Sequence, residues 1–287
     1  RRVLFRSSSM ILILLILVIF QSIITQYFTD NPDFYQLGTD TWESDDFRAM
    51  RLGEGVCSMA ELDGEAVAAL MIQHDYDLRA LLAEDLSWDP SDLLSRRPGD
   101  YQRLSQAYET VFQDLQCFPV PVSLNPDTPD ITYEDGWQDS RTFPSSEQTG
   151  GEAKGTGRVH EGCDLMGEER PSGFYPVVSI SDGIIEQEGW LTLGGWRLGI
   201  RSPGGLYIYY AHLNRYARDW KAGDSVAAGE LLGYMGDSGY GEKGTVGKFP
   251  VHLHLGIYME TDHYDEMSVN PYWLLRFLEK KRLVYQY

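Results

Sequence analysis

Apolar side chains follow one another without interruption near the beginning of the chain. Every residue from Met10 to Phe20 is apolar, and apolar positions continue less regularly as far as Phe28. In a helix, the nineteen residues 10–28 span about 28 Å, close to the hydrocarbon thickness of a bilayer. Because no cleavage site with small residues follows, the pattern favours an uncleaved transmembrane anchor over a signal peptide that is removed.

Charges on the two sides of this apolar run predict its orientation. Three arginines precede it, and three aspartates follow it between positions 30 and 40. By the positive-inside rule, we expect a single-pass protein of the cell membrane whose larger, C-terminal part lies on the extracytoplasmic side. Met10 has the character of a natural initiator, so residues 1–9 are interpreted as a basic tail that can be a cloning remnant. Without that tail the orientation argument weakens, but the span stands.

The next part of the chain changes from irregular to helical periodicity. Residues 29–57 are polar and acidic without a sustained period, which predicts a stalk. Within residues 58–117, apolar positions then recur at three- and four-residue steps in the stretches 59–71, 78–86 and 101–115. This pattern predicts a small helical module. A spacer, an autoinhibitory cover and a partner-binding bundle would share it, so the partner of residues 58–117, if there is one, stays unknown.

Beyond residue 118 the pattern becomes that of a β protein. Prolines interrupt any helix up to Pro144, and the Gly/Ser/Glu-rich residues 145–156 predict a mobile loop. Short β-prone runs then follow at residues 177–180, 183–186, 196–200 and 206–212. Asp182-Gly183 and Gly204-Gly205 are hairpin signals between them. We therefore expect a mainly β domain over 118–270, an antiparallel sandwich or barrel, followed by a C-terminal helix over 271–287.

The net charge of the chain limits the classes of molecule that it is expected to bind. The formal net charge is −19, of which residues 1–29 carry +3, residues 30–150 carry −18 and residues 151–287 carry −4. A negative field of this size repels phosphates, which argues against nucleic acid as a partner. The excess of acidic groups in the middle of the chain is interpreted as a solvated surface.

Cysteines are too few for a disulfide scaffold. The three are Cys57, Cys117 and Cys163, and they lack the spacing of a zinc ribbon. If the chain works outside the membrane, a bridge between Cys57 and Cys117 is a possible pairing. Cys163 is interpreted as a small buried thiol.

Two of the six histidines stand one residue apart in the apolar run Phe249–Ile257. In a strand, alternate side chains point to the same face, so His252 and His254 are expected to lie on one face about 7 Å apart. This arrangement suits one metal ligand and one neighbouring acid or base. Two buried histidines satisfied by their neighbours would be the alternative without a function.

Other residues of the β region can complete a hydrolytic zinc site. Catalytic zinc takes three protein ligands, for which imidazole nitrogen and carboxylate oxygen are suitable, and keeps a fourth position for water. His160 and Asp164 are four residues apart, and Gly162 between them lets the chain fold so that both reach one ion. His254 would be the third ligand. Bound zinc lowers the pKa of its water towards about 7, giving a nucleophile at neutral pH.

Two further histidines can then carry the proton chemistry. His252, on the same strand face as His254, can take the proton of the water. His212, at the end of an aromatic strand, can donate to the developing oxyanion.

With these elements in this order, the sequence resembles the LytM/lysostaphin-type zinc metalloendopeptidases of peptidoglycan. The resemblance covers roughly residues 118–270, about half the chain, and rests on five motifs: His160-x-Gly-x-Asp164, Tyr210-Ala-His-Leu213, Gly223-Asp-Ser-Val226, Gly233-Tyr-Met-Gly-Asp-Ser238 and His252-Leu-His254. It implies Zn²⁺ held by His160, Asp164 and His254, with His212 and His252 as catalytic histidines that do not bind the metal.

The resemblance also implies a fold and a substrate. The fold would be a compact antiparallel β core of the duplicated-hybrid-motif type with a long groove, and the substrate would be the stem peptides or crosslinks of the cell wall. Four tyrosines are candidates to line that groove, although sheet packing explains each equally well: Tyr209, Tyr210, Tyr216 and Tyr240. The segments 239–250 and before Gly157 are longer than is usual in the family, which leaves the bond that is cleaved open.

The hypothesis at this stage is a membrane-anchored zinc metalloendopeptidase that remodels peptidoglycan. A catalytically silent scaffold or activator of the same fold, acting in cell division or sporulation, is the alternative from a different class. Such proteins often lack a metal ligand, whereas none is missing here. A third possibility is an enzyme kept latent by the helical module or by the loop before Gly157, so that removing either would raise its activity.

Overall fold

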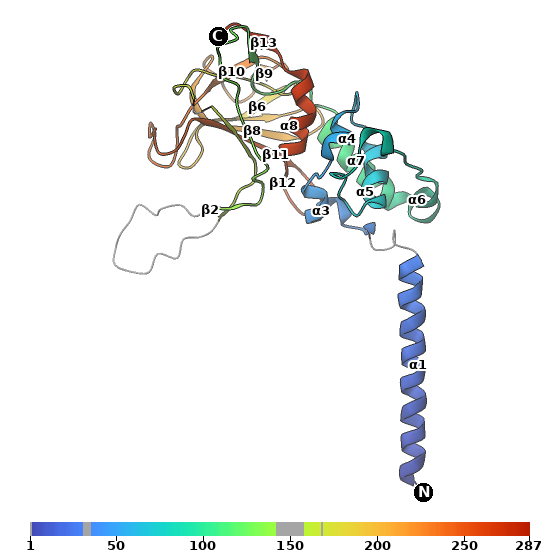
Figure 1. Ribbon diagram of the computed structural model, residues 1–287. Coiled ribbons are helices and arrows are strands. Elements are labelled where there is room, and N and C mark those ends of the chain that lie inside the picture. Colours follow the sequence, from blue (N-terminus) through green and yellow to red (C-terminus); the bar gives the residue numbers. More distant parts are fainter. Residues whose placement is uncertain (1, 31–35, 142–157, 168) are drawn as a thin grey trace, which may run out of the picture.

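A computed structural model describes residues 2–30, 36–141, 158–167 and 169–287 (Figure 1). The loop expected over residues 145–156 lies outside this described part. The first element, α1 (Arg2–Asp30), stands apart from the folded body. Its residues 9–29 have a mean hydropathy of 2.3, and none of its most apolar window is buried. By length and composition this helix can cross a membrane, as a signal sequence near an N-terminus also can.

Short helices after α1 pack into one module. They are η1 (Thr41–Glu43), α3 (Asp45–Arg48), α4 (Gly53–Cys57), α5 (Gly64–Gln73), η2 (Ala83–Asp85), α6 (Ser91–Arg96) and α7 (Pro98–Phe112). The carboxylate of Asp63 accepts from the Ala66 amide at 2.8 Å and so caps the start of α5. Tyr108 of α7 is fully buried, with its ring centroid 4.8 Å from that of Phe47 in α3.

Two expectations for this region differ from the structure. The segment expected to be a stalk folds into the module from residue 36 onward, because Leu37, Phe47 and Leu52 are fully buried in the shared core. Residues 78–86 form only the turn η2 instead of an amphipathic helix. The amide of Leu78 there donates to the carbonyl of Arg51, just before α4, at 2.9 Å.

An antiparallel sheet forms the larger part of the body, as the sequence predicts. Along the described chain its strands are β4 (Cys163–Met166), β5 (Pro176–Val178), β6 (Gly183–Leu191), β7 (Gly195–Arg201), β8 (Tyr207–Tyr216), β9 (Ser225–Val226), β10 (Leu231–Met235), β11 (His252–Met259) and β12 (Met267–Val269). The strand order is β12-β11-β8-β7-β6-β9, with β4 added beside β11 and β10 joining β8 to β5. A separate two-stranded pair consists of β2 (Ser140–Arg141) and β3 (Arg158–Val159).

The two hairpin signals have different outcomes. Gly204-Gly205 lies in the turn between β7 and β8, which pair antiparallel as expected. Asp182-Gly183 is not a hairpin turn, because β5 pairs with β10 while β6 pairs with β7 and β9. Gly183 instead permits a close approach of strands, since a Cβ there would lie 2.6 Å from the carbonyl oxygen of Arg201.

The C-terminal helix is shorter than predicted. It runs over α8 (Tyr272–Leu278), continues as η3 (Glu279–Lys281), and gives way to β13 (Val284–Tyr285), which pairs parallel with β1 (Val122–Ser123). Its expected packing face is confirmed, because the four side chains concerned are at most 9% exposed: Trp273, Leu274, Phe277 and Leu278.

The helical module docks against α8 and β12. Arg48 donates from Nε and Nη2 to the carbonyl and hydroxyl of Ser268 at 3.0 and 2.9 Å. Arg276 of α8 pairs with Glu54 of α4 at 2.7 Å. The bridge between Cys57 and Cys117, which the sequence left open, is absent: both thiols are buried, and each donates to a different backbone carbonyl. Burial of Cys163 is confirmed.

Candidate metal centre and groove

Strand β11 brings the polar residues of the site together. It lies between β4 and β8, so that His254 stands opposite Asp164 on one side and opposite Ala211 on the other. Since side chains alternate along a strand, His252 and His254 face the same side of the sheet, as the sequence predicts. His212 comes from β8, one position beyond Ala211. The sheet register therefore gathers residues that are as far apart as 94 positions in the chain.

Three side chains offer converging donor atoms. Nε2 of His160 lies 3.1 Å from Oδ1 of Asp164 and 3.1 Å from Nδ1 of His254. Nδ1 of His254 lies 2.9 Å from the same carboxylate oxygen. One ligand atom from each residue lies within 4.8 Å of the other two. At zinc bond lengths of about 2.0–2.1 Å, tetrahedral ligand atoms are roughly 3.3 Å apart, so the cluster has the size that a zinc site requires.

The surroundings of His160 and His254 fit a metal ion as well. Nδ1 of His160 donates to the carbonyl of Gly136 at 2.9 Å, which fixes the tautomer and leaves the Nε2 lone pair directed at the cluster. Gly162 lies against the ring of His254, where a Cβ would be only 2.5 Å from Cε1. The donor set is thus held by its neighbours in the orientation that ligation needs.

Asp164 stays ionised in this cluster. Burial by itself would raise the pKa of its carboxyl group, but the imidazole nitrogens of His160 and His254, which lie 3.1 and 2.9 Å from Oδ1, outweigh burial and hold the pKa well below its usual range. An anionic oxygen beside two imidazole nitrogens is the donor combination that suits a divalent cation.

His212 and His252 lie beside the cluster as a pair. Their ring centroids are 4.6 Å apart. Nδ1 of His212 donates to the carbonyl of Ser238 at 2.8 Å, and Nδ1 of His252 donates to that of Pro250 at 2.8 Å. In each neutral ring Nε2 is therefore the acceptor. Burial, together with the neighbouring His252 and His254, lowers the pKa of His212 to about 3, so that this ring is neutral at physiological pH.

A bulge in β8 sets the position of His212. Trp196 of β7 pairs with Leu213, and Leu198 pairs with Tyr210, so Arg197 between them stands opposite two residues of β8, Ala211 and His212. His212 takes a left-handed backbone conformation with φ 61°. A non-glycine residue at positive φ is a strained feature that is typical of functional sites.

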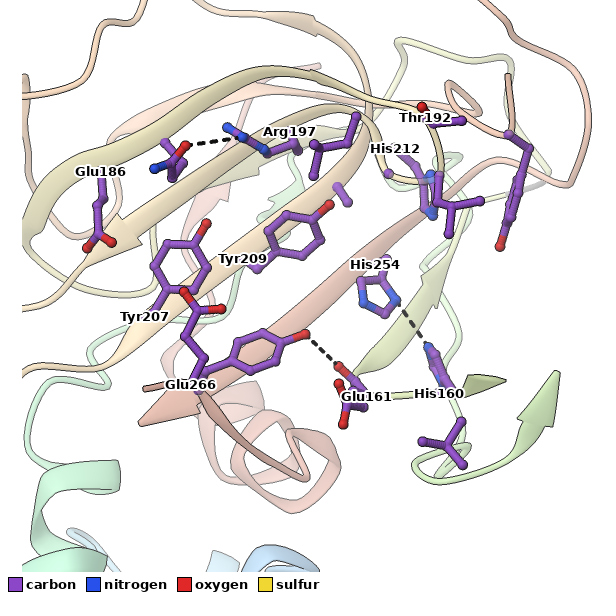
Figure 2. A pocket seen from close by; sticks show the side chains of 18 residues that line it. His160, Glu161, Glu186, Thr192, Arg197, Tyr207, Tyr209, His212, His254 and Glu266 are labelled. Atoms are coloured by element: carbon purple, nitrogen blue, oxygen red, sulfur yellow. Dashed lines mark hydrogen bonds between the residues drawn. The ribbon is translucent and has the colours of Figure 1, made fainter. Parts of the chain in front are cut away.

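An open groove of about 790 Å³ extends from the cluster along the sheet. His160, His212 and His254 line one part of it, and Figure 2 shows Tyr207, Tyr209 and Arg197 along its further course. Of the four candidate tyrosines, Tyr209 and Tyr240 line the groove. Tyr210 is fully buried, with its hydroxyl accepting from the amide of Ile180, and Tyr216 packs in the sheet.

Several groove residues were not indicated by the sequence. Arg197, Glu161, Tyr207, Tyr258 and Glu266 all line it. Apart from Glu161, they lie outside the recognisable motifs, and their place in the groove depends on contacts that are distant in sequence. A weak signal was available for Glu161 alone, because it lies between the motif residues His160 and Gly162.

The chain is similar to several peptidases. A model described as Peptidase family M23 matches residues 158–271. Over 181 residues the chain is 37% identical to the L-Ala–D-Glu endopeptidase of Bacillus subtilis (strain 168). This match covers 63% of this chain and 49% of that protein. It is 39% identical over 86 residues to lysostaphin of Staphylococcus staphylolyticus, covering 29% of this chain and 17% of that protein. The chain thus spans at most about half the length of these relatives.

One solved structure is similar to this chain over nearly the whole of its own length. It is a protein from Ruminococcus gnavus described as a candidate glycyl-glycine endopeptidase LytM. The two chains share 38% sequence identity with a TM-score of 0.70, and the match covers 89% of this chain and 98% of the other. The similarity therefore includes most of the helical module as well as the sheet.

Proposed function

The chain belongs to peptidase family M23, and on that basis we propose that it is a membrane-anchored zinc endopeptidase that hydrolyses peptide bonds of peptidoglycan. The observation that carries the proposal is the meeting of three converging ligand atoms with two neighbouring imidazoles on one side of an open groove. The relatives named for endopeptidase activity support the reaction class.

We assign the metal to His160, Asp164 and His254. When bound there, zinc would supply Lewis-acid chemistry, lowering the pKa of water and polarising the scissile carbonyl group. The chain itself holds the three donors in place through the Gly136 carbonyl and the close approach of Gly162. Such supporting contacts ordinarily change metal affinity by about 10- to 100-fold when they are removed.

His252 is assigned as the proton acceptor. Its Nδ1–H is held by the carbonyl of Pro250, so Nε2 carries the lone pair and lies 3.9 Å from Oδ1 of Asp164, on the side of the cluster. From there it can take a proton from the attacking water and return it to the leaving amine.

For His212 the geometry favours a role that differs from simple donation. A neutral ring whose Nδ1–H is bonded to the Ser238 carbonyl has only an acceptor at Nε2. It can donate to an oxyanion only after it has gained a proton, which its burial opposes. We therefore propose that His212 orients the attacking water by accepting a hydrogen bond from it at Nε2, while His252 takes the proton that the water releases.

We place the catalytic domain on the extracytoplasmic side of the cell membrane, with α1 as its anchor. Support comes from the length and hydropathy of residues 9–29, and from the location of peptidoglycan outside the membrane. The described residues 36–117 contribute none of the residues that line the groove. This arrangement gives no support to the helical module as a cover of the active site.

Digestion of isolated sacculi tests the proposal. The full chain in detergent with zinc is expected to release peptide fragments that mass spectrometry identifies. His252→Ala should reduce the rate by about 10²- to 10⁴-fold, the usual contribution of a general base. His74→Ala removes an exposed histidine at the end of α5 and serves as the matched control with an unchanged rate. Full release by His252→Ala would overturn the assignment, and absence of release by the wild type would favour the scaffold hypothesis.

A further inference from the structure

Arg197 is a buried cation in the wall of the groove. It lies on β7, its side chain is 9% exposed, and it lines the same groove as His254 and His212. Only Nη2 has a hydrogen bond, to Oε1 of Gln187 at 3.3 Å. Nε and Nη1 are shielded from solvent and have no hydrogen-bond partner among the described residues. Figure 2 shows the side chain of Arg197 beyond Tyr209 along the groove.

An arginine in this state is costly for the fold. A buried donor without a partner destabilises a folded protein, and a charged donor does so more strongly. Within the described chain, Arg197 forms no ion pair with a carboxylate. The contrast on the same strand is Arg201, which is held by both oxygens of Glu186 at 2.6 and 3.0 Å. The protein therefore supplies an internal carboxylate to one arginine of β7 and not to the other.

The position of Arg197 connects it with the proposed chemistry. It stands opposite Ala211 and His212 at the bulge of β8. Its backbone carbonyl accepts from the hydroxyl of Tyr216 at 2.7 Å, which ties this part of β7 to the sheet. Gln187 also lines the groove and holds Arg197 by a single long hydrogen bond, so it can be displaced by a stronger acceptor.

We propose that Arg197 is a specificity-determining residue that binds a free carboxylate on the substrate residue next to the scissile bond. The inference rests on the proposed endopeptidase function and deepens it by defining the substrate. Nε and one terminal nitrogen of a guanidinium group match the two oxygens of a carboxylate in a fork-like pair. The substrate carboxylate would displace the Gln187 side chain and supply the partner that the buried cation lacks.

The chemistry of one relative's substrate agrees with this assignment. In an L-Ala–D-Glu bond, the residue that follows the cut carries two carboxyl groups. At most one of them continues the peptide chain, so the other is free unless it is amidated. Substrates with that carboxylate are the class that Arg197 would select, and their carboxamide counterparts are the class that it would reject.

Peptide binding to an inactive variant tests the inference without relying on turnover. Two synthetic peptides are used that differ only in a free carboxylate or a primary carboxamide on the D-Glu residue after L-Ala. Calorimetry with the zinc-loaded full chain carrying His252→Ala should show about 10- to 100-fold tighter binding of the carboxylate peptide, the worth of a charge-assisted hydrogen-bonded pair. Adding Arg197→Gln should remove the preference and leave the affinity for the carboxamide peptide within about threefold.

A matched control and a thermal melt complete the test. Arg201→Gln changes an arginine on the same strand that already has an internal partner, and it should keep the preference. Arg197→Gln should not lower the melting temperature, because it removes an unpartnered buried charge. Equal binding of the two peptides by the Arg197-containing protein, or an unchanged preference in Arg197→Gln, would overturn the inference. Sacculus digestion separately decides the proposed function, so the two failures are distinguishable.

Discussion

At the scale of single residues, the site depends on a position that has no side chain. Gly162 was expected to let the chain fold between His160 and Asp164, and the structure shows a more specific constraint. The ring of His254 occupies the space that a Cβ of residue 162 would need. The absence of one carbon therefore decides where the third ligand atom lies.

Gly162→Ala is expected to weaken zinc binding, because the added Cβ would meet both the ring of His254 and, at 2.7 Å, the carbonyl oxygen of Leu255. The new Cβ would lie 2.5 Å from Cε1 of His254, so that this ring must move away from His160 and Asp164. Competition with a chelator should reveal a loss of zinc affinity of about 10- to 100-fold. Gly99→Ala, at a helix position with no atom within 4 Å of the added carbon, should bind zinc as the wild type does. Equal affinities in the two variants would contradict the account.

The sequence was sufficient to identify the five polar residues that the structure brings together, because their motifs are short and their order is distinctive. The structure does place His160, Asp164 and His254 in one cluster with His212 and His252 beside it. Their roles remain proposals. Arg197 could not have been found, because its burial and the lack of partners for Nε and Nη1 among the described residues depend on contacts that are distant in sequence.

At the scale of elements, the face that a side chain occupies on its strand was easier to predict than the strand that lies beside it. Alternation of side chains predicted that the two histidines of β11 share a face, which holds whatever lies beside the strand. Which strand stands opposite them depends on contacts distant in sequence. The helix expected over residues 78–86 failed for the same reason: the stretch has a helical pattern, but the amide of Leu78 donates to Arg51 and only the 3₁₀ turn η2 forms.

One contact between elements should make the stability of the fold depend on pH. Nδ1 of His263 lies 2.7 Å from Oε2 of Glu43, joining the loop after β11 to η1. The hydrogen bond and charge of Glu43 raise the pKa of His263 above its ordinary value. Burial opposes ionisation of Glu43, but its hydrogen bonds to Thr261 and His263 lower its pKa. The pair contributes fully between about pH 4.3 and 6.5, the ordinary pKa values of Glu and His. Its contribution is lost as pH rises through the raised pKa of His263 and as pH falls through the lowered pKa of Glu43.

His263→Gln should therefore lower the melting temperature more at pH 5.5 than at pH 9. The pH values lie on the two sides of the transition expected for a histidine whose pKa is raised from about 6.5. His74→Gln, at the exposed end of α5, should give the same difference from wild type at both values. A difference for His263→Gln that does not shrink with rising pH would show that the ion pair does not form.

At the scale of the whole molecule, the helical module and the sheet form one body. Their buried side chains belong to a continuous core, and Arg48, Cys57 and Glu54 contact β12 and α8 directly. The sequence predicted both parts from their different periodicities, but it gave no indication that residues 36–57 would join the core. Their polar composition suggested a stalk, but burial of a few large apolar side chains holds these residues in the folded body.

The groove and α1 come from different parts of the chain. Residues 159–266 supply the groove lining, whereas α1 precedes the helical module (Figure 1). An anchored enzyme with its groove outside the module would act on polymer near the membrane. The proposed catalytic site does not depend on the proposed membrane anchor, because the metal ligands come from β4, β11 and the segment after β3 and none comes from α1.

Dependence of catalysis on zinc at one site is the central claim, and a metal titration tests it most directly. The full chain is stripped with a chelator, zinc is added back in steps, and peptide release from sacculi is measured at each step. We expect no release without metal, a linear rise to about one equivalent of zinc per chain, and a plateau, because three protein ligands define one site. Full release by the stripped protein, or restoration of His254→Ala by one equivalent of zinc, would contradict the account.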